Sequence, residues 1–371
     1  MILRQIKISE LTALINSAEY ASWEQVPISK ARAVSQSINP FALPDDIALI
    51  IALDDSGKQL LSYVGAFPSK QKKADNNRFA WNSCWWVKNG EGGEAGMKVF
   101  YTFLQTWNKK VAFSDMTEKT YKIISNLGFC VMMKRDGLVV NIRPGIHSRL
   151  KAINFSNRRI RYFTNLFLYS GISWLFEIFE LLVYNGIRKM RTTDSNRFNP
   201  LKIIDPEKTD FEFINENSRG NFYIPEIEAL KMQPWLITPD DMNAEVRNKY
   251  YFSAVAGEFS TFWLRWEQKG ETNALMMLSL RDGVLKTLFT YCTDDFKTKL
   301  PVAFVNYCFS NPQIRTLITS QPEITHYFSE RKFFILSRRY FTKYSAISKE
   351  LLKNSSDVPV FQDGDGDYRF T

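Results

Sequence analysis

The sequence predicts a mixed α/β fold of the α+β kind, built from two tandem units of similar layout. Three observations predict it. An apolar and aromatic run (79–87), a glycine-rich turn (88–96), a helical pattern (97–107) and a short apolar run (111–114) follow one another in the first half. Two apolar runs at 46–53 and 60–67 precede them as a hairpin across the turn 54–57. The same order of patterns returns in the second half.

The run 79–87 has the length and composition of a buried strand. In 97–107 the apolar residues recur three and four positions apart, as in an amphipathic helix. Glycines between a strand and a helix let a ligand approach the backbone, and the unpaired amides of a helix start attract anionic oxygens. The segment therefore predicts a phosphate-binding turn, although such a turn also serves as a plain connector.

The flanking segments complete the first unit. Residues 2–8 alternate as a strand, 9–18 read as a short helix capped by Ser9, and 120–127 read as a helix. We expect 129–142 to form two paired strands that turn at Asp136-Gly137, a dipeptide typical of hairpin turns.

An internal repeat relates the two halves. The strand, helix, strand and helix patterns at 80–87, 96–104, 111–114 and 120–129 correspond to 285–292, 301–309, 316–319 and 325–334. One ungapped offset of 205 residues relates them, as from 80 to 285 and from 129 to 334. Strands at 261–268 and 273–281 supply the second hairpin. The turn 293–300 contains no glycine and two aspartates, so we expect the second copy not to bind a phosphate there.

Composition narrows the function classes. Hydrophobic residues at 45% and charged residues at 23% indicate a folded globular chain of two domains rather than a disordered one. The formal net charge of +9 favours anionic partners. No nucleic-acid-binding motif is present, so we expect no nucleic-acid partner.

Cysteine and histidine usage narrows the chemistry. The four cysteines lack a Cys-x-x-Cys spacing and read as buried free thiols of a reducing compartment. The two histidines lie apart from cysteines and acidic clusters, which argues against a metal site or a Ser-His-Asp triad. The first eight residues lack the apolar core of a signal peptide, so we predict a cytoplasmic protein.

The predicted domains are 1–147, a basic amphipathic connector at 148–200, and 201–371. Within the connector, the apolar run 162–184 is interrupted by polar residues and flanked by arginines. It predicts a helix that packs between the domains or, as the alternative, lies peripherally on an anionic membrane surface at the inner membrane face. The acidic stretch 363–367 resembles the start of a calcium loop without its distal glutamate, and we expect a flexible acidic turn.

The order strand, glycine turn, helix, strand, helix and Gly128-Phe129 over 22–143 resembles the GNAT superfamily of acyl-CoA-dependent N-acyltransferases. In that family a turn of the form Gln/Arg-x-x-Gly-x-Gly/Ala holds the pyrophosphate of coenzyme A. Gly93 and Ala95 match it, and Gly90 stands where the family has Gln or Arg. The resemblance implies two tandem GNAT-like domains, each a mixed, largely antiparallel sheet flanked by helices. It also implies acetyl-CoA or another acyl-CoA as substrate, bound by Trp85, Trp86, Val87, Gly90, Gly92, Gly93, Ala95 and Gly96.

Two residues are candidates for catalysis. The family often has a tyrosine four residues before the glycine of its Gly-Phe pair, where it acts as general acid on the departing thiolate. In this sequence Ile124 occupies that position. Tyr121, one helical turn earlier, is the candidate acid, with core or surface packing as its alternative. Asp115, after the strand 111–114, is the candidate base or acceptor-binding group, with a turn or helix-cap role as its alternative.

The resemblance implies an acyl-CoA-dependent N-acyltransferase, similar to acetyltransferases, that acts on a small-molecule amine. An amino sugar or another cell-envelope precursor is one candidate acceptor. The amine would meet the thioester between splayed strands at 83–87 and 111–115, where backbone amides near Trp85 and Val87 polarise the carbonyl. The alternative is a binding or scaffold protein with a GNAT-like fold that has lost its chemistry.

Overall fold

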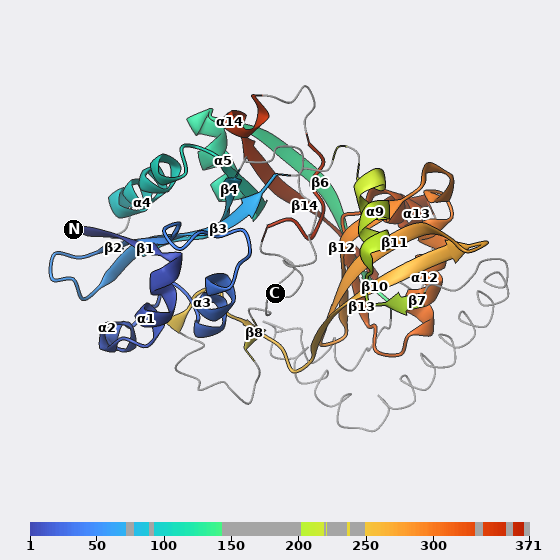
Figure 1. The fold of residues 1–371 in the computed structure, drawn as a ribbon, viewed down its shortest axis with the longest axis horizontal. Coiled ribbons are helices and arrows are strands. Elements are labelled where there is room, and N and C mark those ends of the chain that lie inside the picture. Colours follow the sequence, from blue (N-terminus) through green and yellow to red (C-terminus); the bar gives the residue numbers. More distant parts are fainter. Residues whose placement is uncertain are drawn as a thin grey trace, which may run out of the picture.

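The computed structural model describes residues 1–71, 78–88, 93–142, 202–218, 220, 236–237, 249–330, 337–353 and 359–366. Within these residues twelve strands form one mixed sheet, and helices cover both of its faces. The first half lies at the left of Figure 1 and the second half at the right. The predicted mixed, largely antiparallel strand pairing with flanking helices is confirmed, and the two sheets predicted for the two units are joined into one.

The first half runs in the predicted order, with its first helix divided into short pieces. Ser17, not Ser9, caps a helix in this region, because its hydroxyl accepts from the Tyr20 amide at the start of α2. The elements are β1 (Ile2–Lys7), η1 (Ile8–Glu10), α1 (Leu11–Ile15), α2 (Ala18–Ser22), α3 (Lys30–Ser37), β2 (Ile47–Leu53), β3 (Leu60–Lys70), β4 (Arg78–Val87), α4 (Gly93–Thr106), β5 (Val111–Met116), α5 (Glu118–Leu127) and β6 (Cys130–Asn141).

The second half repeats this layout. The elements are β7 (Lys202–Ile204), α9 (Lys208–Asn217), β8 (Leu236–Ile237), β9 (Ala254–Val255), β10 (Phe259–Gln268), β11 (Glu271–Arg281), β12 (Val284–Cys292), η2 (Asp294–Phe296), α12 (Leu300–Ser310), β13 (Thr316–Thr319), α13 (Pro322–Glu330), β14 (Ser337–Ser348) and α14 (Lys349–Leu352). β13 has the predicted bounds, and β12 and α12 begin one residue early.

The repeat extends to backbone irregularities. β4 carries an extra residue, Ser83, opposite the step from Gly65 to Ala66 of β3. β12 carries an extra residue, Leu288, opposite the step from Met277 to Leu278 of β11. The offset between these two bulges is the one that relates the sequence patterns. A bulge bends its strand and redirects the groups beside it, so both halves share a local device as well as an order of elements.

The halves exchange their last strands. The sheet order is β1-β2-β3-β4-β5-β14-β6-β13-β12-β11-β10-β7, so β14 of the second half pairs with β5, and β6 of the first half pairs with β13. β6 and β14 also pair with each other over their full lengths, from Cys130 opposite Ser348 to Asn141 opposite Ser337. The two strands cross the centre of the molecule in Figure 1.

The predicted hairpin at Asp136-Gly137 is wrong, because β6 is one continuous strand of 12 residues. The local turn signal is overridden by the antiparallel pairing with β14, where Gly137 lies opposite Phe341. A Cβ at Gly137 would overlap the Phe341 ring. The glycine therefore serves the close approach of that ring and not a turn.

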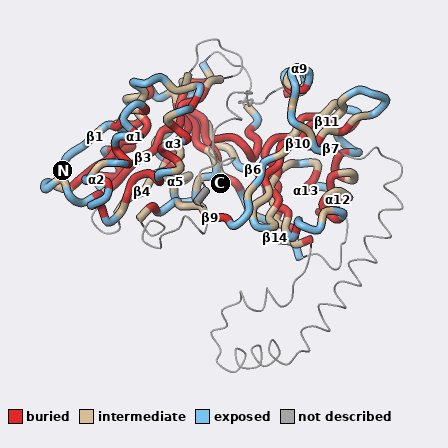
Figure 2. Tube along the Cα trace, turned by 60° about the horizontal axis from the view of Figure 1, so that its bottom comes forward, coloured by how far each residue is buried: buried red, intermediate tan, exposed pale blue. Residues whose placement is uncertain are grey.

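Among the described residues, four apolar cores hold the sheet and its helices together. α4 packs on β2, β3 and β4, and the segment with α1–α3 covers the opposite face. α12 and α13 cover a face of the second half. Their apolar residues form one core with strand residues, including Leu138 and Val140 of the exchanged strand β6. The fourth core joins the halves, since it contains Trp81 and Ile347 beside Leu288 and Phe289. The buried parts of the chain follow the strands of both halves in Figure 2.

The expected flexible acidic turn at 363–367 is corrected over its described part. Residues 361–366, which we call the tail segment, are buried, with Asp363 and Asp365 exposed by only 6% and 1%. The predicted connector 148–200 and its run 162–184 lie outside the described residues. No helix in the described part of the chain is both long enough and apolar enough to cross a membrane.

Candidate functional site

The parallel strands β4 and β5 diverge within their lengths. They pair from Ala80 opposite Val111 to Asn82 opposite Phe113, although β4 continues to Val87 and β5 to Met116. We call residues 83–87 and 114–116 the first fork. The bulge at Ser83 begins the fork on the β4 side. The predicted divergence of 83–87 from the strand that ends near Asp115 is therefore present.

The hydrogen-bond pattern decides which amides face the fork. The Lys88 amide donates to the Leu61 carbonyl of β3 at 2.9 Å, and antiparallel pairs alternate, so Trp86 and Cys84 also bond toward β3. The amides of Trp85 and Val87 consequently point away from β3, toward the first fork. Trp86 turns its carbonyl toward β3, where it accepts from the Ser62 hydroxyl at 2.7 Å.

The side chains of the two tryptophans lie on opposite faces of β4. Trp85 stacks on Phe100 of α4, with ring centroids 4.6 Å apart. Trp86 stacks on Tyr63 of β3 at 5.3 Å. Three β4 residues are predicted to bind the cofactor. Trp85 and Val87 direct their backbone amides to the fork, whereas the Trp86 side chain packs against the core on the α1–α3 side of the sheet.

The glycine turn leads into the start of α4. Gly90 and Gly92 lie outside the described residues, and α4 begins at Gly93. A Cβ at Gly93 would meet no atom of the described residues within 4 Å, so space is open on that side of the backbone. A Cβ at Gly96 would lie 2.6 Å from Cγ2 of Val87. Gly96 therefore lets the first turn of α4, with its unpaired amides and buried Ala95, approach the end of β4.

The acidic side chain of this first turn has a partner. Glu94 forms an ion pair of 2.6 Å with Lys98, one helical turn later, and that hydrogen bond lowers the pKa of Glu94. The neighbouring cation offsets the charge that Glu94 presents to an anion at the helix start.

Asp115 lies at the β5 side of the first fork. Its backbone is left-handed, with φ at 50°, and it lies within the irregularity, between Phe113 and Met116, that shifts the pairing of β5 with β14. The side chain is exposed. Asp115 also interacts electrostatically with Lys286 on β12, so the site lies where the two halves meet.

Tyr121 lies on α5 and packs against the exchanged strands. Its ring is 4.8 Å from the Tyr344 ring of β14, and the Lys134 ammonium of β6 lies 5.4 Å from its centroid. These contacts fit the packing alternative, and the structure describes no contact between Tyr121 and Asp115.

Sequence reasoning missed Arg32 and Tyr250. Arg32 of α3 is 4% exposed and donates to the Ser83 carbonyl, at the fork, at 3.0 Å. It also donates to the Tyr250 hydroxyl, and burial raises the pKa of that tyrosine. A buried arginine within a short polar helix has no local signal, because only the packing of α3 on β4 brings it to the bulge.

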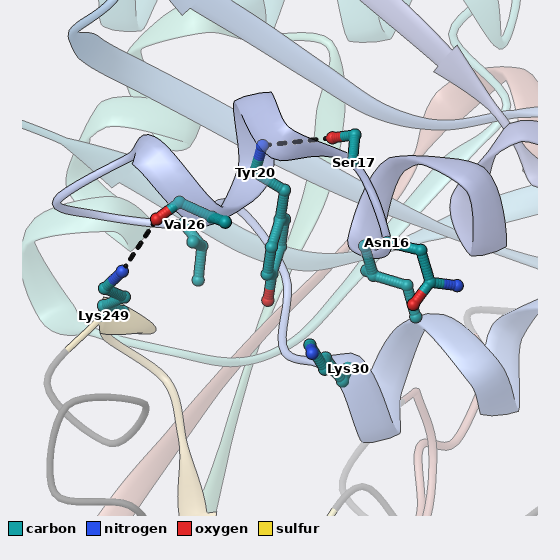
Figure 3. Close-up of a pocket in the computed structure, with 8 residues that line it drawn as sticks. Asn16, Ser17, Tyr20, Val26, Lys30 and Lys249 are labelled. Atoms are coloured by element: carbon teal, nitrogen blue, oxygen red, sulfur yellow. Dashed lines mark hydrogen bonds between the residues drawn. The ribbon is translucent and has the colours of Figure 1, made fainter.

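Two hollows lie outside the first fork. One, of about 320 Å³, is lined by α1 and α2 residues such as Tyr20 and by Lys30 and Lys249 (Figure 3). Lys249 donates to the Ala21 carbonyl at 3.1 Å. The other, of about 620 Å³, lies between Arg135 of β6 and α13. Among the described residues no cluster of His, Cys, Asp or Glu has a metal-binding arrangement.

No protein-family model and no curated protein sequence matches this chain. The chain is similar to 124 chains of solved structures, three of which follow. The first, from Pyrococcus horikoshii, is provisionally named an acetyltransferase; it is 11% identical, with 94% of this chain and 89% of that chain covered and a TM-score of 0.44. An Enterococcus faecalis protein provisionally assigned as an N-acyltransferase is 10% identical, with 94% and 72% covered and a TM-score of 0.44.

The third is the GCN5-related glucosamine N-acetyltransferase region of a fungal multi-domain GH3 β-N-acetylglucosaminidase. It is 8% identical, with 93% of this chain and 38% of that chain covered and a TM-score of 0.46. At these TM-scores the assignment of the fold depends on the strand order of this chain itself. One of the three is named GCN5-related, and the names of the other two give acetyltransferase and N-acyltransferase.

Proposed function

We propose that this protein transfers an acyl group from acetyl-CoA or another acyl-CoA to a small-molecule amine at the first fork. The observation that carries the proposal is the pair of β4 amides, Trp85 and Val87, that point into the fork beside the start of α4. The extended arm of acyl-CoA contains amide groups, and these can pair with the exposed edge of β4 as another strand would. The first-turn amides of α4 would then receive the pyrophosphate.

The reaction follows from this placement. The amine nitrogen attacks the thioester carbonyl, the C–S bond breaks, and coenzyme A leaves as a thiolate. The amide of Trp85 or Val87 would hold the oxyanion that develops on the carbonyl. Asp115, directly or through water, would take the proton from the amine, and Tyr121 is the proposed donor to the thiolate.

Acyl-CoA titration tests the proposal. Wild-type protein is titrated calorimetrically with acetyl-CoA and longer acyl-CoAs, and compared with Gly93→Asp, which places a carboxylate at the helix start. We expect micromolar binding by wild type and at least a tenfold loss in Gly93→Asp, because the new charge repels the pyrophosphate. Gln105→Asp, which adds the same charge on an exposed position of α4, is the matched control and should bind as wild type.

Absence of binding by the wild-type protein would contradict the proposal and favour the scaffold alternative. Binding without release of free thiol on addition of amines would also favour a GNAT-like binding protein. A panel of amino sugars and other amines, scored by thiol release, would identify the acceptor class. An amino sugar or another cell-envelope precursor remains our proposed acceptor.

We also propose a cytoplasmic location with peripheral contact between residues 158–191 and an anionic membrane. The basis is the arginines around the apolar run 162–184. Flotation with anionic liposomes should recover wild-type protein and lose a Trp174→Asp/Phe179→Asp variant. Equal recovery of both proteins with the lipid would contradict the contact.

A further inference from the structure

The second half contains a fork built like the first. β12 and β13 pair from Val284 opposite Thr316 to Lys286 opposite Ile318, and β12 then continues to Cys292. We call residues 287–292 and 319–320 the second fork. The Thr287 and Thr319 hydroxyls lie 2.7 Å apart where the strands begin to diverge.

The alternation of antiparallel hydrogen bonds also directs one β12 amide, that of Thr290, into the second fork. The Thr293 amide donates to the Asn273 carbonyl of β11 at 3.0 Å, so the Tyr291 amide also faces β11 and the Thr290 amide points away from it. In the repeat, Thr290 corresponds to Trp85 of β4. Where the Trp85 amide faces the first fork, the Thr290 amide donates to Oε1 of Gln362 at 2.6 Å.

The tail segment bonds to both sides of the second fork. On the β12 side, the Gly364 amide donates to the carbonyl of the bulge residue Leu288 at 2.7 Å. On the β13 side, the Ser320 amide donates to Oδ2 of Asp363 at 2.7 Å, and the Thr287 hydroxyl donates to the same oxygen at 3.2 Å. The segment therefore bridges the diverging strands through main-chain and side-chain groups.

The buried Lys343 and the partly exposed Arg135 complete a carboxylate site around Asp363. The Lys343 ammonium, on β14, lies 3.2 Å from Oδ1, and the Arg135 guanidinium, on β6, lies 3.4 Å from it. Lys343 is 4% exposed. Burial alone would disfavour the charged carboxylate, but these two cations hold the pKa of Asp363 below its usual value.

Glycine is required at two positions of the tail segment. A Cβ at Gly364 would overlap the Phe289 ring, and a Cβ at Gly366 would overlap the Ser114 hydroxyl of β5. Gly366 also has a left-handed backbone, with φ at 78°. The segment thus lies in close contact with the second fork at Gly364 and with the first fork at Gly366.

We propose that the second fork is a binding site for a short acidic peptide in a turn conformation, and that the chain's own tail segment, whose Asp365 amide donates to the Gln362 carbonyl at 3.3 Å, is its resident ligand. Gln362 and Gly364 use the β12 edge, which corresponds to the β4 edge assigned to the acyl thioester in the first fork. The protein consequently holds one acyl-CoA per chain. This last statement rests on the proposed function, whereas the peptide site does not.

Cleavage of the full chain tests the peptide site. A protease recognition sequence replaces residues 354–358, the folded protein is cut, and gel filtration with intact-mass measurement follows. We expect the fragment from residue 359 onward to remain with the body. A labelled synthetic peptide of residues 359–371 should replace it on mild warming. The Asp363→Asn peptide should bind at least tenfold more weakly, since the buried Lys343 and the partly exposed Arg135 lose their anionic partner.

The body is identical in both peptide measurements, so misfolding of a variant cannot produce the difference. A Val360→Thr peptide is the matched control, because the Val360 side chain is 54% exposed, and it should bind as the native peptide. If neither peptide displaces the fragment, the cut Asp363→Asn protein decides, and its fragment should separate from the body.

Loss of the native fragment from a folded body, or equal binding of the native and Asp363→Asn peptides, would overturn the peptide site. Retention of the fragment by the cut Asp363→Asn protein would do the same. Two acyl-CoA molecules bound per intact chain would contradict the statement that the tail segment keeps acyl-CoA out of the second fork. A chain that binds no acyl-CoA but retains its tail fragment would refute the proposed function alone.

Discussion

Lys286 lies half-buried on β12, close to the meeting of the two halves. Burial, with the nearby charges of Arg281 and Lys343, lowers its pKa to about 8, while Asp115 and Asp363 act in the opposite direction. Because the net effect disfavours the ammonium form, the folded state binds this proton less tightly than the unfolded chain does.

We therefore predict that Lys286→Met stabilises the protein at pH 7 by roughly 1–2 kcal/mol, allowing for the side chain's partial exposure. Between a pH of about 8 and the ordinary lysine pKa of 10.5, the unfolded wild type still holds the proton that the folded wild type has lost. The stability of the wild type should consequently rise with pH relative to the variant. Urea unfolding of both proteins from pH 7 to 10.5 measures this, and a constant difference would contradict it.

Gly93 and Gly96 provide a second comparison of single residues. A Cβ at Gly96 would lie 2.6 Å from the Val87 side chain, and one at Gly93 would meet nothing within 4 Å in the part of the chain that the structure describes. We predict that Gly96→Ala costs about 1–3 kcal/mol through crowding, whereas Gly93→Ala is neutral or stabilising by up to about 1 kcal/mol. Denaturant unfolding measures both, and equal stabilities would contradict the close approach of α4 to β4.

At the scale of elements, the pairing of β6 with β14 has the largest consequences. Each strand completes the sheet of the other half, and α5 leads into β6 through a left-handed Gly128, with φ at 70°. Thr117 caps α5 by accepting from the Thr120 amide. Ordinary signals at the two ends of α5 thus precede β6, although β6 pairs with β14, near the other end of the chain.

We predict that Gly137→Ala destabilises the protein by about 1–3 kcal/mol, because the new methyl group overlaps the Phe341 ring. Phe341→Leu in the same chain should recover part of that loss. A double-mutant cycle, measured by urea unfolding, should give a coupling energy of about 1 kcal/mol or more between the two positions. Additive losses would contradict direct contact between residue 137 and the Phe341 ring.

At the scale of the molecule, the exchanged strands and the core around Trp81 and Phe289 make the two halves interdependent. Neither half closes its own sheet without a strand of the other. The domain boundaries at 147 and 201 remain a prediction. Because the two halves share one sheet, we expect them to unfold together.

We predict one cooperative unfolding transition for both halves. Phe103→Ala in the first half and Phe304→Ala in the second each remove a fully buried ring and should cost about 3–5 kcal/mol. Both should lower the midpoint of the same single transition, observed by circular dichroism and by tryptophan fluorescence. Separate transitions, each sensitive to one variant only, would contradict this interdependence.

The sequence by itself determined the elements and their repetition. Apolar periodicity predicted β4, α4, β5 and β13, and the constant offset between the halves predicted the second copy, because period and burial are local properties of a strand or helix. The candidate site was predictable where it depends on backbone, at the divergence after Asn82 and at Gly93. Arg32 and Lys286 were not, because distant segments bring them there.

Only the tertiary structure decided how the elements are connected in space. The Asp136-Gly137 turn signal lost to the pairing of β6 with β14, and the acidic tail became buried around Asp363. The physical reason is the same in both cases. A strand edge or a buried cation needs a partner, and the chain satisfies that need with whichever segment the whole fold brings within reach, however far away in sequence.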